Sequence, residues 1–474
     1  MPRPRDVPLL IPLLVTVAVA AVVALAIQPA GFVNYDTEYA LLWGNDLIHG
    51  RVPDYGVPFA PTPHPLATLV GAFGALFGPT FGEDLFLLIA FLALGVLAWL
   101  VYALGAAWFT RATGVVAAVI VLTREPILSY GVRAYVDIPY MCLLLGALLV
   151  ETRRSRAGTP VLVLIGLAGL LRPEAWLFAL AYAYWLWRGG ALTLKHIILV
   201  VGAPLLWALS DLVIAGNPLH SLTGTRSTAR DLDRETGLLH VPTLLPRRLG
   251  EILREPILFG AAVGGILSLW RLRERRGVVL GAAAGVLAVI AFCLLATAGL
   301  SILTRYLLLP ATILAIFAAA GICAWTELPR ADPWRGRWMA LGALTVLLTL
   351  AFVPSQVDRL RNTRNALITQ THILDELHAM TDKYLMCSAT TVTVPNRRAV
   401  PQMALWMDIP PNHVYSAQEL RRYPLTSSAF APVSPAVAKQ FVLDTSDKDQ
   451  TLPPPPSNRL SERGRYWNLY GECP

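Results

Sequence analysis

Residues 9–27 read LLIPLLVTVAVAAVVALAI, and no charged side chain interrupts them. A run of this length crosses the hydrocarbon core of a bilayer as one helix, because a span takes about 20 residues. The basic stretch MPRPRD comes before it, as in a signal peptide, but the run is long and its small-x-small triplets lie inside it. We therefore predict a retained first transmembrane helix with the N-terminus in the cytoplasm.

The composition of the whole chain extends this pattern. Of its 474 residues, 55% are hydrophobic and 15% are charged, whereas a soluble domain carries about 25% charged residues. A soluble enzyme, a disulfide-rich secreted module and a disordered chain are excluded, and the alternating pattern of an outer-membrane barrel is absent. The net charge of +8 does not indicate a nucleic-acid partner, because no basic stripe interleaved with aromatic residues accompanies it.

The charges of the loops predict the orientation. We expect a polytopic α-helical membrane protein of about 11 transmembrane helices, at residues 8–29, 84–107, 113–124, 137–150, 159–171, 174–188, 196–214, 256–271, 277–298, 303–325 and 337–354. The loops that would face the cytoplasm are short and basic, as the positive-inside rule requires; they are residues 1–6, 108–114, 151–158, 188–196, 270–277 and 327–338. This pattern predicts a multi-pass protein of the plasma (inner) membrane.

One apolar stretch decides the helix count. Residues 64–81 (HPLATLVGAFGALFGPTF) are apolar enough to span, but they contain three glycines and two prolines. Counting them as a span would place every later basic loop outside. We therefore expect an outer juxtamembrane helix that lies at the membrane interface.

The C-terminal region lacks long apolar runs. We predict a transmembrane module of residues 1–354 and a small extracytoplasmic α/β domain of residues 355–474. The domain has β-like runs at 386–394 and 440–443, a helix-like run at 361–384 and a PPPP stretch at 453–456. Cys387 and Cys473 could pair there in an oxidising compartment.

Acidic residues follow the outer ends of two predicted helices. Asp36 and Glu38 come just after the first helix, in NYDTEYALLWGNDLIHG, and Asp137 begins another, in YVDIPYM. Each aspartate could simply cap a helix N-terminus. The alternative is a general base at the membrane surface, where partial loss of solvation raises a carboxylate pKa towards the working pH.

Cationic residues interrupt apolar sequence at the same predicted face. GLLRPEAW contains Arg172 and Glu174, SILTRYLLLPA contains Arg305 and Tyr306, and Arg133 lies four residues before Asp137. Arg172 and Glu174 could form an internal ion pair in a tight turn, and Arg305 could extend to the lipid headgroups. The alternative is a set of arginines that binds an anionic group.

These motifs together resemble the GT-C superfamily of membrane glycosyltransferases, in the branch with the protein O-mannosyltransferases and the lipid A aminoarabinose transferases. The acidic pair in YDTEYALLWGNDLIHG is followed by PHPLATLVGAFGALFG, YVDIPYM, GLAGLLRPEAW and TRYLLLP. Order and spacing match over about residues 30–320. The match is to the superfamily and not to one substrate, so mannosyltransferase-like and arabinosyltransferase-like activities both fit.

The resemblance implies an inverting glycosyltransferase with a GT-C-like fold. A polyprenyl-phosphate-linked sugar would be the donor, and a glycan, lipid or protein would accept the sugar at the outer face. Asp36 matches the family's catalytic carboxylate and would deprotonate the acceptor. Asp137 would orient the acceptor or a phosphate-binding arginine, and Arg172 and Arg305 would bind the leaving phosphate.

Two positions depart from the family pattern. Relatives often have a lysine where this chain has Pro63 and His64, and they have DE where this chain has D-T-E at 36–38. No DxD pattern lies at these helix ends, so neither a metal nor a cofactor is expected. The predicted catalytic residues are Asp36 and Asp137. The predicted substrate-binding residues are Glu38, His64, Arg133, Arg172, Glu174, Arg305 and Tyr306.

Two other functions fit a polytopic chain with outer arginines. A transporter or flippase could move an anionic lipid-linked substrate with the same cations, but such proteins often show internal repeats and broken helices, and no inverted repeat is evident. A non-catalytic membrane assembly protein could bind a partner through the C-terminal domain. The concentration of candidate charges at one face favours surface chemistry.

Overall fold

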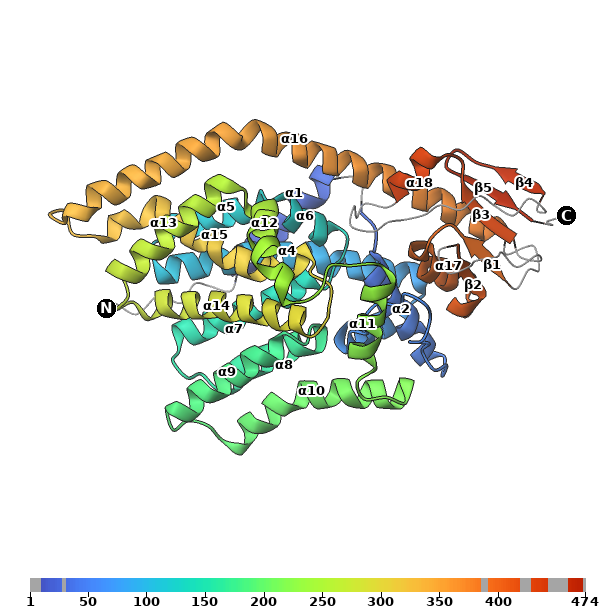
Figure 1. Cartoon of the computed structure of the whole chain (residues 1–474), viewed down its shortest axis with the longest axis horizontal. Helices are drawn as coiled ribbons and strands as arrows, with labels where there is room; N and C mark the ends of the chain where they lie inside the picture. The colour runs from blue at the N-terminus through green and yellow to red at the C-terminus, as the bar shows by residue number, and fades with distance from the viewer. Residues whose placement is uncertain (1–9, 28–30, 385–390, 418–427, 442–458, 472–474) are drawn as a thin grey trace. The chain divides into compact units, whose positions relative to one another are not determined.

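The computed structural model describes residues 10–27, 31–384, 391–417, 428–441 and 459–471. Most of these residues are helical, and a small sheet lies near the C-terminus (Figure 1). Cys387, Cys473 and the PPPP stretch lie outside the described residues, so the predictions on them stay predictions.

The α-helices in chain order are α1 (Leu10–Ile27), α2 (Tyr35–Ile48), α3 (Pro65–Ala75), α4 (Pro79–Trp108), α5 (Arg111–Leu122), α6 (Glu125–Val132), α7 (Asp137–Arg153), α8 (Thr159–Leu171), α9 (Ala175–Arg188), α10 (Leu194–Ala215), α11 (His220–Asp231), α12 (Val241–Leu253), α13 (Glu255–Arg271), α14 (Arg276–Thr297), α15 (Leu308–Cys323), α16 (Pro333–Tyr384), α17 (Val400–Met407) and α18 (Pro435–Phe441). Short 3-10 helices are η1 (Leu238–His240), η2 (Thr304–Leu307), η3 (Ala324–Glu327), η4 (Arg397–Ala399) and η5 (Pro411–His413). The strands are β1 (Val392–Val394), β2 (Val414–Ser416), β3 (Ser428–Pro432), β4 (Leu460–Arg463) and β5 (Trp467–Tyr470).

Every predicted transmembrane segment contains a helix, and the predicted bounds of α8 are those of the structure. Within the described ranges, six helices are long and apolar enough to cross a membrane, or up to eight if each of two bent pairs forms one span. The other predicted segments are shorter helices, so the count of 11 crossings stays a prediction. The apolar helices nevertheless make this a multi-pass membrane protein.

The stretch 64–81 is not one helix. It divides into α3 (Pro65–Ala75) and the first residues of α4, which begins at Pro79. The 11 residues of α3 rise about 17 Å, well short of a bilayer core of about 30 Å. Its length thus agrees with the expectation that this segment does not span.

Helix α16 corrects the sequence prediction for residues 337–384. The predicted span at 337–354 and the predicted helix at 361–384 are parts of one helix of 52 residues. Charged residues after Pro354 end the apolar run but do not end the helix. Hydropathy marks where a helix loses its membrane character, whereas a helix end requires a loss of backbone hydrogen bonding.

The chain forms two compact units that do not follow chain order. Unit 1 contains Met1–Ala26, Leu88–Ala208 and Glu235–Arg361. Unit 2 contains Ile27–Leu87, Leu209–Arg234 and Asn362–Pro474. Helices α4, α10 and α16 each continue from one unit into the other.

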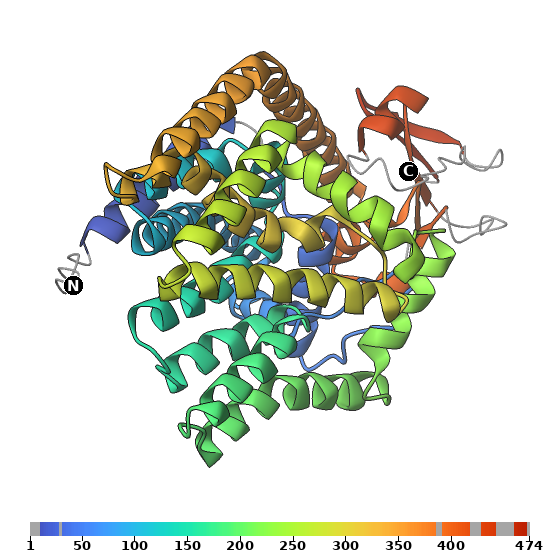
Figure 2. The ribbon, with the colours of Figure 1, turned by 60° about the vertical axis from the view of Figure 1, so that its left-hand side comes forward.

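Unit 1 is a helical bundle in which glycines permit close packing. A side chain at Gly264 of α13 would overlap the backbone of Phe317 in α15, and one at Gly321 would overlap Gly260. Helices α8 and α9 run side by side (Figures 1 and 2). Small residues that let helix backbones approach are typical of helix contacts in membranes.

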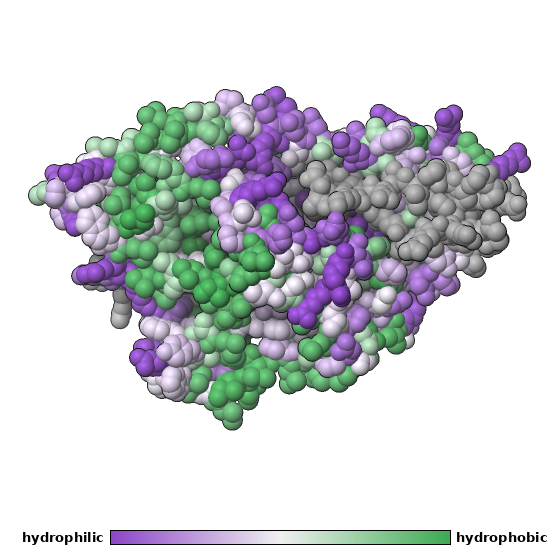
Figure 3. All heavy atoms as spheres, viewed as in Figure 1, coloured by the Kyte–Doolittle hydropathy of each residue, from purple (hydrophilic) through white to green (hydrophobic). Residues whose placement is uncertain are grey.

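The outer surface of unit 1 is apolar over several helices. Figure 3 shows hydrophobic residues gathered over α13 and α14, where Ile266, Val286 and Ile290 have exposed side chains. A surface of this kind is stable in contact with lipid rather than with water.

Ion pairs join three loops at one end of the unit 1 bundle. Arg271 pairs with Asp332, Arg275 with Glu327, and Arg276 with Glu151. These loops are three of those predicted to face the cytoplasm. The structure therefore places them at a common end of the bundle, as the predicted topology requires, whereas their cytoplasmic location stays a prediction.

Unit 2 combines two closely packed helices with the sheet. A side chain at Gly44 of α2 would overlap the backbone of α3 at Ala72. The five-stranded sheet has the order β2-β1-β3-β5-β4. Strand β1 pairs in parallel with β2 and β3, and β5 pairs antiparallel with β3 and β4. The α/β character predicted for the C-terminal region is confirmed.

The strand bounds differ from those predicted. Of the run 386–394, the described strand is β1 (Val392–Val394), and residues 386–390 lie outside the described residues. Gln440 and Phe441 end helix α18 instead of starting a strand. The carbonyl of Phe441 accepts a hydrogen bond of 2.7 Å from Gln370 of α16, which ties the helix end to α16.

Candidate functional site

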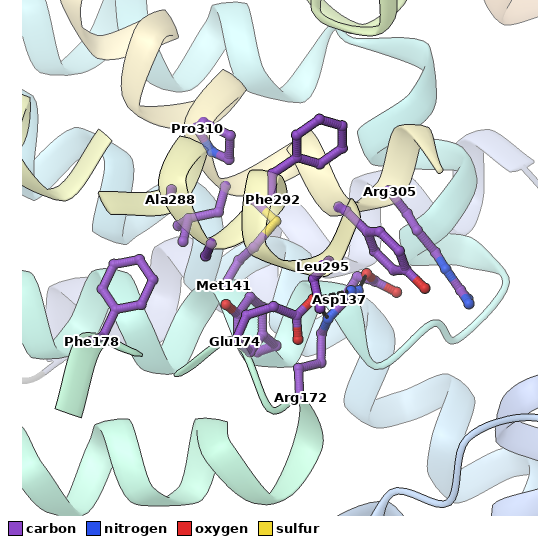
Figure 4. Close-up of a pocket in the computed structure, with 14 residues that line it drawn as sticks. Asp137, Met141, Arg172, Glu174, Phe178, Ala288, Phe292, Leu295, Arg305 and Pro310 are labelled. Atoms are coloured by element: carbon purple, nitrogen blue, oxygen red, sulfur yellow. Dashed lines mark hydrogen bonds and ion pairs between the residues drawn. The ribbon is translucent and has the colours of Figure 1, made fainter. Parts of the chain in front are cut away.

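Arg172 is the centre of a charged cluster in unit 1. It lies between α8 and α9 in an extended conformation, because the following proline disfavours helical geometry at the residue before it. Its guanidinium pairs with Asp137 at the start of α7, and with Glu174 at 2.5 Å. Figure 4 shows the side chain of Arg172 directed at Asp137, with Glu174 beside it.

The predicted turn with an internal ion pair is thus present, but it is only part of the cluster. The Arg172–Asp137 pair joins two positions 35 residues apart, and the side chains of all three residues are at most 8% exposed. Two carboxylates against one buried guanidinium satisfy its fork of donors and fix its orientation. Asp137 does not act as an N-cap, since Val136 occupies that position and α7 has no side-chain cap.

Arg305 and Tyr306 line the same pocket as this cluster. They belong to η2, which leads into α15. The Arg172 guanidinium lies 4.4 Å from the ring centroid of Tyr306 and 5.5 Å from that of Tyr140. Asp137, Arg172, Glu174, Arg305 and Tyr306 therefore surround one space.

Arg133 joins the cluster through an aromatic ring. Its guanidinium lies 5.1 Å from the ring centroid of Tyr135, and that of Arg305 lies 5.5 Å from the same ring. The result is a row in which arginines alternate with tyrosine rings, from Arg133 through Arg305 to Arg172. Such cation–π contacts hold guanidinium groups in place without neutralising their charge.

An apolar cavity adjoins the charged pocket. Phe178 and Leu309 line both, and in Figure 4 Phe178 lies on the side of the pocket away from Arg305. The cavity encloses about 1040 Å³, including space open to the outside. Its lining is almost wholly apolar and comes from α7, α8, α9, α14 and α15. The charged pocket and the apolar cavity together form a space with one charged end and one apolar end.

Asp36 lies in unit 2, in the first turn of α2. The N-cap of α2 is Asn34, whose side chain accepts hydrogen bonds from the backbone N–H of Asp36 and Thr37. The interpretation of Asp36 as an N-cap is therefore wrong. Asp36 is half-buried, so its carboxylate is neither fully solvated nor enclosed.

Glu38 lies in the same first turn of α2 and faces a second carboxyl group. Its side chain is within hydrogen-bonding reach of Glu83 of α4. Within the described part of the chain no other N–H or O–H group reaches its oxygens. Burial raises the pKa of Glu38 well above the ordinary glutamate value, and the carboxyl group of Glu83 raises it further. The surroundings of Glu38 therefore favour the protonated, uncharged form of its carboxyl group.

Glu83 has a second contact, from the C-terminal region. The indole N–H of Trp406 in α17 donates to it at 2.9 Å, and the Trp406 ring stacks on His378 with centroids 4.2 Å apart. Sequence reasoning did not single out Glu83 or Trp406. The local signal for Glu83 was weak: it is an acidic residue close to the start of a long apolar helix, in PTFGEDLF.

His64 is the N-cap of α3, and its side chain makes no capping hydrogen bond. It is half-buried and belongs to unit 2 with Asp36 and Glu38. Among the described residues, no three His, Cys, Asp or Glu side chains are arranged to hold a metal ion. Metal independence itself stays a prediction.

Comparison with solved structures identifies the fold. ArnT from Cupriavidus metallidurans bound to undecaprenyl phosphate has a TM-score of 0.59 and 12% identity, with 97% of each chain covered. The apo state of the same ArnT has a TM-score of 0.54. An oligosaccharyltransferase from Archaeoglobus fulgidus, tethered with an acceptor peptide, has a TM-score of 0.51 and 13% identity, over 87% of this chain and 64% of that chain.

The chain has the fold of ArnT and of this oligosaccharyltransferase. The predicted resemblance is confirmed at the level of the fold. No protein-family model matches the sequence, and no curated protein matches it. At these identities the structural likeness shows the fold alone, so activity and substrates must be argued from the chain's own residues.

Proposed function

We propose that the protein is an inverting glycosyltransferase that moves a sugar from a polyprenyl-phosphate donor to an acceptor at the outer face of the membrane. The observation that carries this proposal is the charged pocket around Arg172 and Arg305, which adjoins an apolar cavity. An amphiphile with an anionic head and a long apolar tail fits this pair of spaces. The similar ArnT structure was solved with undecaprenyl phosphate bound.

The charges of the pocket suit a leaving phosphate. The charge of Arg172 is offset by Asp137 and Glu174. The two carboxylates hold its guanidinium in one position, and the group does not create a large positive field. Arg305 adds a further cation at the same space. As the bond between the anomeric carbon and the phosphate oxygen breaks, negative charge grows on the lipid phosphate. Preorganised cations stabilise that charge more than they stabilise the donor.

Asp36 is the proposed general base. Its carboxylate is not needed to cap α2, because Asn34 does so. It would take the proton of the acceptor hydroxyl as the oxygen attacks the anomeric carbon opposite the phosphate, which inverts that centre.

The other predicted residues receive supporting roles. Asp137 and Glu174 are positioning residues for Arg172, while Arg133 and Tyr306 belong to the row of arginines and rings beside the pocket. Glu38 is buried against Glu83, so we no longer assign it a direct substrate contact. His64 remains a proposed phosphate neighbour. The sugar would be a hexose or pentose, and the acceptor a glycan, lipid or protein of the cell envelope.

The experiment is sugar transfer by the purified protein with Asp36→Asn as the test variant. The donors are polyprenyl-phosphate-linked mannose, glucose and arabinose, with membrane extracts of the source cells as acceptors. Asp358→Asn is the matched control, because the Asp358 side chain is 68% exposed on α16. We expect transfer by the wild type and by the control, and a loss of about 10³-fold or more in Asp36→Asn.

Equal transfer by Asp36→Asn would show that Asp36 is not the base. Absence of transfer by the wild type, together with movement of polyprenyl phosphate across the membrane of reconstituted vesicles, would favour the flippase alternative. If the protein neither transfers sugar nor moves polyprenyl phosphate, the result favours the non-catalytic assembly role. The outer location of the site is tested separately, by reporter fusions after residue 158 and after Pro474, which should report opposite sides of the membrane.

A further inference from the structure

The C-terminal region packs against α2 through one short segment of unit 2. This α17 segment (residues 397–408) consists of η4, α17 and the residue that follows. Helix α17 lies against α2, the helix that begins one residue before Asp36. Three side-chain contacts connect the segment to α2 or to its immediate neighbours.

The first contact is at the N-terminus of α2. Arg397 is 4% exposed, and its guanidinium lies 5.9 Å from the ring centroid of Tyr35 and 5.8 Å from that of Phe59. Tyr35 in turn donates a hydrogen bond of 2.9 Å to the carbonyl of Phe59. Tyr35 directly precedes Asp36, so this contact fixes the residue next to the proposed base.

The second contact is in the first turn of α2 and passes through α4. Trp406 donates to Glu83 at 2.9 Å, and Glu83 lies beside the buried carboxyl group of Glu38. Glu38 lies two residues after Asp36 in the same helical turn. A buried carboxyl pair with one indole donor is orientationally demanding, because each group must point at the next for the buried polar atoms to be satisfied.

The third contact is at the other end of α2. Arg51 pairs with Asp408 at 3.0 Å and with Asp46 of α2 at 2.9 Å. The α17 segment thus reaches α2 at its first residue, in its first turn and near its last turn. Contacts at both ends restrict sliding and rotation of a helix, which a single contact would permit.

We propose that the α17 segment is a positioning element for α2, and that Arg397 and Trp406 hold the turn that presents Asp36. The C-terminal region is then part of the catalytic unit and not an appendage. This inference rests on the proposed function of Asp36. A displacement of about 1 Å in a reacting group costs about 100-fold in rate, so a contact that aligns α2 has a measurable effect on the chemical step.

The test compares two tryptophans of the same region in the full-length protein. Trp406→Phe removes the N–H that binds Glu83 and keeps a ring to stack on His378. Trp467→Phe is the matched control: Trp467 also donates its indole N–H, to the carbonyl of Ile373 at 2.8 Å, but it lies in β5 and its ring packs on Phe441 of α18.

Two readouts separate alignment from general damage. With polyprenyl-phosphate sugar as donor, we expect Trp406→Phe to lower kcat about 10-fold or more, with KM for the donor changed less than about 2-fold, and Trp467→Phe to leave kcat within about 2-fold. Amide hydrogen exchange needs no substrate. The amides of α2 should exchange about 10-fold faster in Trp406→Phe and be unchanged in Trp467→Phe.

Two replacements of Glu83 test whether its hydrogen-bonding groups account for the loss of kcat. Glu83→Gln keeps an acceptor for Trp406 and can donate its amide N–H to Glu38, whereas Glu83→Leu can do neither. We expect Glu83→Gln to keep kcat within about 2-fold and Glu83→Leu to resemble Trp406→Phe. Arg397→Gln should lower kcat as well, and Arg397→Lys should restore part of it through the retained cation.

Each outcome bears on one proposal or the other. Unchanged exchange in α2 of Trp406→Phe, or equal losses of kcat in both tryptophan variants, would overturn the positioning role. Faster exchange in α2 with no sugar transfer by the wild type would support the mechanical contact and count against the glycosyltransferase. Equal losses in Glu83→Gln and Glu83→Leu would overturn the role of the shared hydrogen bonds.

Discussion

The two units bury acidic side chains in different ways. In unit 1, Asp137 and Glu174 face a cation, the guanidinium of Arg172. In unit 2, Glu38 faces another carboxyl group, that of Glu83, and burial favours the protonated form of Glu38. Both arrangements avoid an isolated buried charge, which would be costly.

The difference has a consequence for pH. Burial and the neighbouring carboxyl group raise the pKa of Glu38. Loss of the proton from this pair would place like charges side by side. The packing of α2 in unit 2 should therefore weaken as pH rises.

The largest expected effect is loss of the cation in unit 1. Arg172→Gln leaves Asp137 and Glu174 buried without a counter-charge, which should lower the free energy of unfolding by about 3–5 kcal/mol. The measurement is reversible unfolding in detergent micelles without donor. Asp137→Asn in the same chain should restore part of the loss. If Arg172→Gln unfolds like the wild type, the ion pairs do not hold α7 to the α8–α9 turn.

The second expected effect concerns orientation of that cation. Asp137→Asn removes one of the two carboxylates that pair with Arg172 and leaves only Glu174. The guanidinium can then turn away from the proposed phosphate position. We expect kcat to fall about 100-fold, with a smaller loss of stability than in Arg172→Gln. A variant that is destabilised but transfers sugar at the wild-type rate would remove Asp137 from the proposed mechanism.

The third effect tests the carboxyl pair through pH. Between the ordinary glutamate value of 4.5 and the raised pKa of the folded protein, the folded state binds more protons than the unfolded state. The free energy of unfolding therefore falls as pH rises through this window. Glu38→Gln removes the titrating group, so this variant should be more stable than the wild type at pH 8, by an amount on the order of 1–2 kcal/mol. Parallel pH profiles for the two proteins would show that Glu38 is not buried as a protonated acid.

The smallest effect concerns the apolar cavity beside the unit 1 pocket. Ala284 of α14 lines this cavity, and Ala284→Phe should raise KM for a long-chain polyprenyl donor about 3- to 10-fold, since it removes apolar contact area. A short-chain donor should be affected less. Ala282→Phe on the same helix, outside the cavity lining, is the control. Equal KM values in both variants would mean that the lipid tail lies elsewhere.

Much of the fold could be predicted from local sequence. Each apolar run that was predicted to span the membrane contains a helix, and the charged residues Arg172 and Glu174 marked the turn between α8 and α9. The continuity of α16 could not be predicted from hydropathy, because charged side chains after Pro354 are compatible with a helix that has left the apolar environment.

The residues of the candidate site also divide into those that local sequence made conspicuous and those that it did not. Asp137, Arg172, Glu174 and Arg305 stood out because charges are rare in apolar sequence, and the structure places them around one pocket. Glu83 and Trp406 did not stand out, since 323 residues separate them and neither belongs to a recognisable motif. The N-cap interpretation of Asp36 failed because Asn34, two residues earlier, takes that role.

The sequence by itself determined that this chain is a helical membrane protein and where most of its helices lie, because hydropathy and charge act locally along a helix. Only the tertiary structure decided how each buried acid is compensated. Asp137 meets an arginine 35 residues away, while Glu38 meets a carboxyl group on another helix. Which charges meet depends on how the helices pack, and packing is set by contacts between residues distant in sequence.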